Sequence, residues 1–214
     1  MLAQVHIKRK KSAKLQFNEK AMLKTPPNYI VGIGGSAGGL KAYKELLEAL
    51  PSDTGMAFVF VSHMFPEATS QLAHILSRHT KMPATVATAR IDILANHVYI
   101  IAPNVDLNIE DSVFKVISPR IKRNTQIDVF FTSLAVSMGK RAIGIILSGY
   151  DGDGTEGCKQ IKAKGGITFA QDDSADISHM SLSAQATECV DFVLSPKKIA
   201  EELIKLANNC LRVA

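Results

Sequence analysis

The chain has 214 residues, 46% of them hydrophobic, and a formal net charge of +5. This length allows one α/β domain with a well-filled core, and no apolar run approaches the roughly 20 residues that a membrane-spanning helix needs. Seven of the 25 basic residues lie within residues 1–27 beside one acidic residue, which leaves 18 basic and 19 acidic residues in 28–214. Residues 28–214 therefore lack the basic surface of a nucleic-acid-binding domain, and we expect residues 1–27 to be a basic tail or linker.

The beginning of the chain and its cysteines both indicate a cytoplasmic protein. No apolar segment follows the first basic residues, as one would in a secretory signal. Cys158, Cys189 and Cys210 are odd in number and lack the spacing of metal ligands. We therefore expect buried, reduced thiols and no transmembrane segment.

From residue 28 onward, short apolar runs alternate with helical patterns, as in βαβ units. In chain order, the sequence predicts a strand at 29–34, a helix at 39–50, a strand at 56–62, a helix at 69–80, short strands at 97–103, 106–111 and 112–118, a helix at 127–139, a strand at 141–149, a helix at 154–166, strands at 167–171 and 191–195, and a helix at 196–210. A turn at Glu110-Asp111 predicts an antiparallel hairpin on the edge of the sheet. The fold class is α/β: one doubly wound, mainly parallel sheet flanked by helices, Rossmann-like and three-layered, with an antiparallel edge hairpin.

The glycine-rich turn after the first strand has two interpretations. From Gly32 it reads G-x-G-x-x-A, a dinucleotide-binding fingerprint, and from Gly34 it reads G-x-S-x-G, a turn that presents a serine nucleophile. A dinucleotide site requires an acidic residue at the end of the second strand, but Asp53 precedes that strand and His63 stands at its end. A dinucleotide-dependent oxidoreductase is therefore a distant alternative.

Three residues with hydrolytic chemistry follow three predicted strands: Ser36, His63 and Asp153. The carboxyl ends of parallel strands meet at one edge of a sheet, so these side chains should converge there. A hydroxyl becomes a good nucleophile when an imidazole takes its proton and a carboxylate orients that imidazole. The sequence thus predicts nucleophile Ser36, base His63 and orienting Asp153, with backbone N–H groups at the helix N-terminus for an oxyanion. Each residue also has a structural interpretation: Ser36 as a helix cap, His63 as a hydrogen-bonding residue, and the Asp-Gly loop as a plain turn or a weak calcium-like loop.

From about Ile30 to Pro196, the residues resemble the catalytic domain of the chemotaxis protein-glutamate methylesterase, closest to the version fused to a receptor methyltransferase. Six blocks in the same order carry the resemblance: "GIGGSAGGL", "VSHM", "ANHVYIIAPN", "IDVFFTSLA", "AIGIILSGYDGDGTEG" and "QDDSADISHMSLSA". The resemblance implies the same Ser36, His63 and Asp153 triad and a catalytic domain over 28–214.

The family resemblance also implies a substrate and its surroundings. The substrate class is a glutamate methyl ester on the cytoplasmic helices of a chemoreceptor, and the family can also deamidate glutamine. No metal and no organic cofactor is required, because acyl transfer by a triad needs none. The partners implied are the methylated receptor and a response-regulator or methyltransferase partner. The substrate or oxyanion region is carried over to Gly35, Ala37, Gly38, Met64, Tyr150 and Met180.

The chain departs from the family pattern at several positions. Tyr150 and Asp151 stand where smaller or less polar residues are usual, and Asp151 places a second carboxylate beside the triad. The family's G-M-P is His179-Met180-Ser181 here, and the segment "RIKRNTQ" lacks the usual H-x-P or R-x-P pattern. Residues 1–27 leave no room for the family's receiver domain.

The departures bear on substrate identity and rate more than on the triad. The alternative function is a non-catalytic module that binds a receptor or a signalling partner on the same fold, and the intact triad argues against it. We expect His74, His79 and His97 to be dispensable, and the role of His179 stays open.

Overall fold

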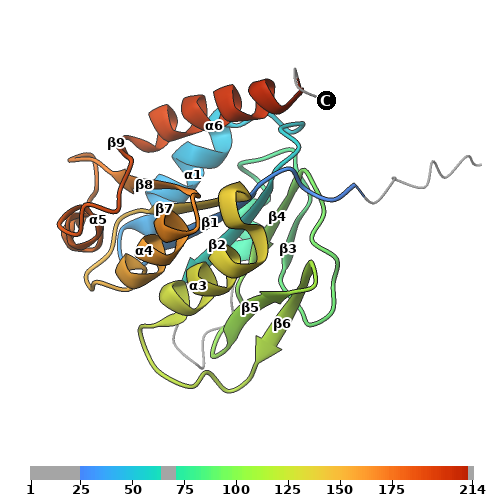
Figure 1. Ribbon diagram of the computed structural model, residues 1–214, viewed down its shortest axis with the longest axis horizontal. Coiled ribbons are helices and arrows are strands. Elements are labelled where there is room, and N and C mark those ends of the chain that lie inside the picture. Colours follow the sequence, from blue (N-terminus) through green and yellow to red (C-terminus); the bar gives the residue numbers. More distant parts are fainter. Residues whose placement is uncertain (1–24, 64–70, 212–214) are drawn as a thin grey trace, which may run out of the picture.

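The computed structural model describes residues 25–63 and 71–211, without the side chains of residues 210 and 211. Its centre is a seven-stranded sheet in which every pair of neighbouring strands is parallel (Figure 1). The strand order is β3 (Ala84–Val86), β4 (His97–Ile100), β2 (Ala57–Ser62), β1 (Ile30–Gly35), β7 (Ala142–Ile146), β8 (Ile167–Gln171) and β9 (Phe192–Leu194). The predicted doubly wound α/β fold is confirmed.

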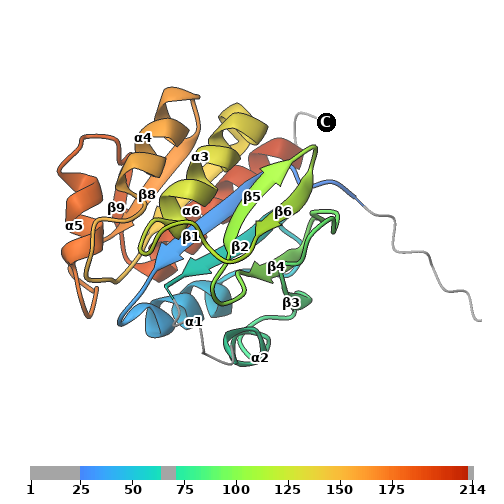
Figure 2. The same ribbon diagram turned by 90° about the horizontal axis from the view of Figure 1, so that it is seen from below.

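Helices cover both faces of the sheet. One face is covered by α1 (Gly39–Ala49), α2 (Leu72–Leu76) and α6 (Pro196–Leu211), and the other by α3 (Gln126–Met138), α4 (Thr155–Ala163) and α5 (His179–Gln185). Figure 2 shows α3 and α4 above the sheet and α1 and α2 below it. Two separate apolar clusters, one on each face, form the core, which explains why the central strands read as continuous apolar runs.

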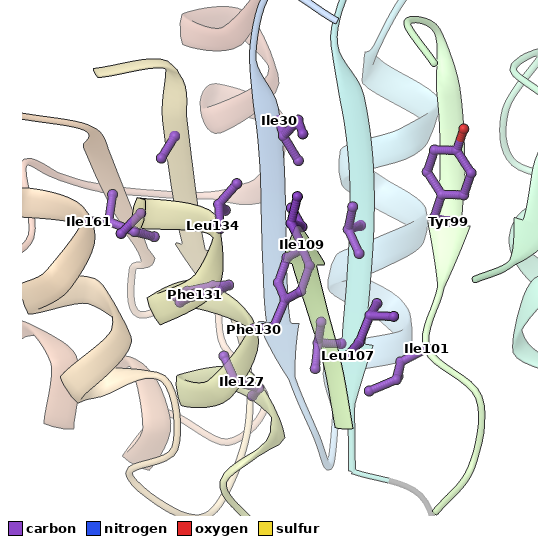
Figure 3. Close-up of a cluster of buried hydrophobic side chains, with 14 of the residues drawn as sticks. Ile30, Tyr99, Ile101, Leu107, Ile109, Ile127, Phe130, Phe131, Leu134 and Ile161 are labelled. Carbon is purple, nitrogen blue, oxygen red and sulfur yellow. The ribbon is translucent and has the colours of Figure 1, made fainter. Parts of the chain in front are cut away.

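The predicted hairpin exists but is not an edge of the main sheet. Strands β5 (Asp106–Glu110) and β6 (Val113–Ile117) form their own two-stranded antiparallel sheet, whereas the edge strands are β3 and β9. Leu107 and Ile109 are buried beside α3, as Figure 3 shows. The backbone of Ile109 bonds to α3 instead of a strand: its N–H donates to Ser133 Oγ at 3.1 Å and its carbonyl accepts from Ser137 Oγ at 2.9 Å. The two serine hydroxyls thus take the place of a neighbouring strand.

A few elements differ from the sequence prediction. Strand β3, helix α5 and a 3₁₀ turn at Gly139–Arg141 were not predicted, because they are too short for a periodic pattern. Helix α2 covers Leu72–Leu76 instead of 69–80, and the predicted capping residues Thr69 and Ser70 lie outside the described residues.

Helix α3 lies against β1 at two glycines. A Cβ on Gly32 would lie 2.7 Å from Phe131 Cε1, and one on Gly34 would lie 2.6 Å from Ile127 Cγ2. Figure 3 shows Ile127, Phe131 and Leu134 directed from α3 toward β1. Gly32 and Gly34, which open the dinucleotide-like fingerprint, therefore serve helix packing in this fold.

Cys158 and Cys189 are buried free thiols, as predicted, and Cys210 falls outside the described side chains. Within residues 25–63 and 71–211, no helix has the length and apolar character needed to cross a membrane.

Candidate active site

The three predicted residues lie at the ends of adjacent strands. Strand β1 has β2 on one side and β7 on the other, and Gly35 pairs in register with Ser62. Ser36 and His63 therefore leave the sheet at the same level on neighbouring strands. Asp153 lies in the loop between β7 and α4, beyond the same edge.

The turn that carries Ser36 is fixed by Ser148, which follows β7. The N–H of Ser36 donates to the Ser148 carbonyl at 2.9 Å, and Ser148 Oγ donates to the Ala37 carbonyl at 2.8 Å. Helix α1 is capped by Gly38, with φ +77° and no side-chain capping bond. The interpretation of Ser36 as a helix cap is therefore wrong, and its half-buried hydroxyl is available for other chemistry.

Two glycines of this turn have no room for a side chain. A Cβ on Gly38 would lie 2.4 Å from Ser148 Oγ, and one on Gly35 would lie 2.5 Å from the Tyr43 hydroxyl. Tyr43 is fully buried, and this burial raises the pKa of its phenol well above the usual range. The turn that carries Ser36 thus packs against the buried, uncharged phenol of Tyr43.

His63 and Asp153 form a short contact. Nε2 of the imidazole lies 2.6 Å from Asp153 Oδ2, and the Asp153 side chain has no exposed surface. The first turn of α3 supplies the remaining donors: Ile127 N–H donates to Oδ2 at 3.0 Å and Asp128 N–H donates to Oδ1 at 2.9 Å. Asp153 therefore caps the N-terminus of α3 and also contacts Nε2 of His63.

The other ring nitrogen of His63 faces a second carboxylate. Nδ1 lies 3.3 Å from Asp151 Oδ2, as the sequence position of Asp151 led us to expect. Within the described residues, no hydrogen bond joins the Ser36 hydroxyl to the His63 ring. Of the predicted line of hydroxyl, imidazole and carboxylate, the structure shows the His63–Asp153 contact, and the Asp151 carboxylate lies at the ring nitrogen that Ser36 would use.

Asp128 mirrors the role of Asp153. Its Oδ1 accepts the Gly157 N–H of α4 at 2.7 Å, so Asp128 holds the N-terminus of α4 as Asp153 holds the N-terminus of α3. Desolvation, with a contribution from the nearby charge of Asp153, raises the pKa of Asp128 to about 6.

Ser36 and His63 open into a shared cleft of about 340 Å³. The residues that line it are Ser36, His63, Arg120, Arg123, Asn124, Tyr150 and Asp151. A larger hollow of about 730 Å³ lies near Asn28, Thr54 and His97, at the opposite ends of the strands, away from these groups. The smaller cleft is the candidate site, since it holds the convergent polar groups.

The remaining predicted residues have different positions. Tyr150 is 69% exposed and lines the cleft. Met180 is fully buried against Gly149, where a Cβ would lie 2.6 Å from Met180 Cε, so it supports the loop from beneath. Met64 lies outside the described residues.

None of the histidines expected to be dispensable, His74, His79 and His97, lines the cleft; their ring nitrogens contact Arg78, Glu48 and the Ala95 carbonyl.

Arg120, Arg123 and Asn124 line the cleft but were not predicted as site residues. Their signal was the basic run just before α3, which we noted only as a departure from a family pattern. Among the described residues, no group of three or more His, Cys, Asp or Glu side chains could hold a metal ion.

Comparisons with known proteins agree with this architecture. Residues 31–203 match the family model described as CheB methylesterase. A protein of Leptospira interrogans is 37% identical over 183 residues, which cover 84% of this chain and 95% of the relative. The protein-glutamate methylesterase/protein-glutamine glutaminase of Hydrogenovibrio crunogenus is 31% identical over 188 residues, covering 85% of this chain and 50% of the relative. The crystal structure of the Thermotoga maritima CheB methylesterase catalytic domain matches with a TM-score of 0.76 and 26% identity, over 83% of this chain and 98% of that one.

Proposed function

The chain belongs to the CheB methylesterase family of hydrolases, and from that membership we propose that it demethylates glutamate methyl esters on the cytoplasmic helices of chemoreceptors. One observation carries the proposal: Ser36 and His63 share a cleft, and a fully buried Asp153 lies 2.6 Å from the same histidine. A buried carboxylate on an imidazole beside a serine hydroxyl is the arrangement that acyl transfer requires.

The reaction has two steps. Ser36 Oγ attacks the ester carbonyl while His63 takes the hydroxyl proton on Nδ1, the nitrogen that does not contact Asp153. His63 then returns that proton to the departing methanol, which leaves a glutamyl ester on Ser36. In the second step, water gives a proton to His63 and attacks this ester, and His63 then returns the proton to Ser36 Oγ as its bond to the acyl carbon breaks, which releases glutamate and regenerates the Ser36 hydroxyl.

Backbone N–H groups are available for the oxyanion. Ser36 and Gly39 use their N–H groups within the turn, donating to the Ser148 and Ser36 carbonyls. The N–H groups of Ala37 and Gly38 have no hydrogen-bond partner among the described residues. Both lie at the N-terminus of α1, where free donors and the helix dipole stabilise negative charge. They are the donors that we assign to the tetrahedral intermediate.

The same path accommodates a glutamine amide, with ammonia leaving in place of methanol, and the name of the Hydrogenovibrio relative includes this activity. The methylated receptor domain is the substrate, and a response regulator or a methyltransferase is the regulatory partner. The proposed substrate and partners are cytoplasmic, and we propose the same location for this chain.

A non-catalytic module that binds receptor helices is the second candidate. The contact between His63 Nδ1 and Asp151, together with the absence of a Ser36–His63 hydrogen bond among the described residues, favours it. A complete set of serine, histidine and buried aspartate at one edge argues for the enzyme, because binding alone requires none of them.

Methanol release distinguishes the two functions. Receptor membranes carrying tritiated methyl esters are incubated with the wild-type chain, Ser36→Ala, His63→Ala and the control His97→Ala. We expect Ser36→Ala and His63→Ala to lower the rate roughly 10³-fold or more, by analogy with other triads, and His97→Ala to keep it. Equal slow release by wild type and Ser36→Ala would contradict the enzyme.

A further inference from the structure

One wall of the cleft is basic. It is formed by the 118–125 loop, residues 118–125 between β6 and α3, which Figure 1 shows in yellow-green. Arg120 and Arg123 of this loop line the cleft with Ser36 and His63, and Lys122 is exposed between the arginines. Neither Lys122 nor Arg123 forms an ion pair within the described part of the chain. The facing acid, Asp151, contacts His63 instead.

Buried polar groups hold the loop backbone in place. Asp106, 1% exposed, accepts the Ile121 N–H on Oδ2 at 2.8 Å and the Gln126 side-chain amide on Oδ1 at 3.2 Å. The same Gln126 amide donates to the Lys122 carbonyl at 2.6 Å, and Arg120 N–H donates to the Asn104 carbonyl at 2.9 Å. Because the loop backbone is held at these points, a ligand would have only the exposed side chains left to order.

Two large apolar side chains accompany these charges. Ile121 is 82% exposed and Tyr150 is 69% exposed, and Tyr150 lines the same cleft. Exposed apolar groups interleaved with guanidinium groups favour a partner that has both carboxylates and apolar side chains. A nucleic acid would use the charges but not Ile121.

The uncharged ester substrate does not by itself explain the basic wall, and the oxyanion that forms during the reaction already has the Ala37 and Gly38 N–H donors assigned to it. A glutamate methyl ester is uncharged, so the arginines gain no ion pair from it. Resting on the proposed function, we infer that the 118–125 loop selects substrates in which free carboxylates flank the methylated glutamate on an amphipathic segment. Carboxylates beside the ester would meet Arg123 and Lys122 while the apolar face meets Ile121 and Tyr150.

Two synthetic helical peptides test the inference. Each carries one glutamate methyl ester, flanked by glutamates in one peptide and by alanines in the other. Alanine is used as the neutral residue in place of glutamine, because the glutaminase activity would convert glutamine to glutamate. For the wild-type chain at low salt we expect kcat/KM to be roughly five- to tenfold higher on the acidic peptide, with the preference lost near 0.5 M salt.

Substitutions in the 118–125 loop test whether its basic residues cause the preference for the acidic peptide. Lys122→Glu/Arg123→Glu should abolish or invert the ratio of the two kcat/KM values, and the milder Arg123→Ala should reduce it. Lys140→Glu is the matched control, because Lys140 is an exposed lysine at the far end of α3. Circular dichroism melts check that every variant is folded.

The outcomes separate the two proposals. If the wild-type chain hydrolyses neither peptide, the proposed function fails. If it hydrolyses both at equal rates, or if the charge-reversed double variant keeps the wild-type ratio, the enzyme stands and the selectivity inference is overturned.

Discussion

At the scale of single residues, His63 lies between two carboxylates. Asp153 is 2.6 Å from Nε2 and fully buried, whereas Asp151 is 3.3 Å from Nδ1 and its side chain is 32% exposed. The buried carboxylate also caps a helix and cannot move without breaking two backbone bonds. Among the described residues, Asp151 accepts only one backbone N–H, that of Asp153 at 3.2 Å, so Asp151 is the group that yields when Ser36 uses His63.

Removing Asp151 should therefore raise the chemical rate. We expect Asp151→Gly to increase kcat for a small ester about threefold or more, because a competing acceptor leaves Nδ1. In the wild-type chain, the Asp153 N–H donates to Asp151 Oδ1 at 3.2 Å, and Asp151→Asn keeps an oxygen that can accept this bond. We therefore expect Asp151→Asn to raise kcat less than Asp151→Gly does. Single-turnover kinetics measure this directly. A lower kcat in both variants would instead assign Asp151 an orienting role.

Asp128 should make stability depend on pH. Its pKa is raised to about 6 in the folded chain, from 3.8, so its protonated form contributes stability that is complete below about pH 4 and is lost as pH rises from there through about 6. Asp128→Asn stays neutral and still accepts from Gly157. Between pH 4 and 7 we expect wild type to lose about 1 kcal/mol more unfolding free energy than the variant, after allowing for solvent screening. Urea unfolding at both pH values checks it, and parallel curves would refute it.

At the scale of elements, close helix packing connects the catalytic carboxylate to the sheet. Helix α3 lies against Gly32 and Gly34 of β1, and α4 lies against α3 at Gly157. The backbone N–H groups at the start of α3 in turn hold Asp153. The position of this carboxylate thus depends on two helix contacts that only glycines allow.

A methyl group at the α3–α4 contact should separate the helices. A Cβ on Gly157 would lie 2.4 Å from Phe131 Cβ and 3.2 Å from Asp128 Cα, neither of which can move independently. We expect Gly157→Ala to cost about 1–3 kcal/mol of unfolding free energy, despite the better helix propensity of alanine. The exposed Lys159→Ala in the same helix should stay within about 0.5 kcal/mol. Equal urea midpoints for both variants would show that the contact is loose.

At the scale of the whole molecule, two apolar clusters on opposite faces of one sheet account for the fold. Within residues 25–63 and 71–211, both clusters are made by residues from Tyr29 onward. Two backbone contacts precede them in this part of the chain: the Thr25 carbonyl accepts the Ala95 N–H at 2.9 Å, and the Asn28 N–H donates to the Gly55 carbonyl. We propose on this basis that residues 28–214 form the domain and that 1–27 is a basic tail.

Deletion of residues 1–24 tests that boundary while keeping the Thr25 contact. We expect the unfolding free energy to stay within about 0.5 kcal/mol of wild type and kcat/KM for a small ester to change less than about twofold, because the two apolar clusters of the described residues are made from Tyr29 onward. The measurements are urea unfolding and esterase kinetics. A loss of several kcal/mol would place part of this segment within the folded domain.

The sequence by itself determined the layers of this protein and the edge at which its chemistry lies. Apolar runs and helical spacing specify parallel strands and covering helices, and parallel strands necessarily bring Ser36, His63 and Asp153 to one edge. Only the tertiary structure decided that the β5–β6 hairpin lies against α3, that Asp151 and Asp153 contact different ring nitrogens of His63, and that Arg123 lines the cleft. These contacts join segments far apart in the chain through loops and glycine-sized gaps, and no local periodicity encodes where such segments meet.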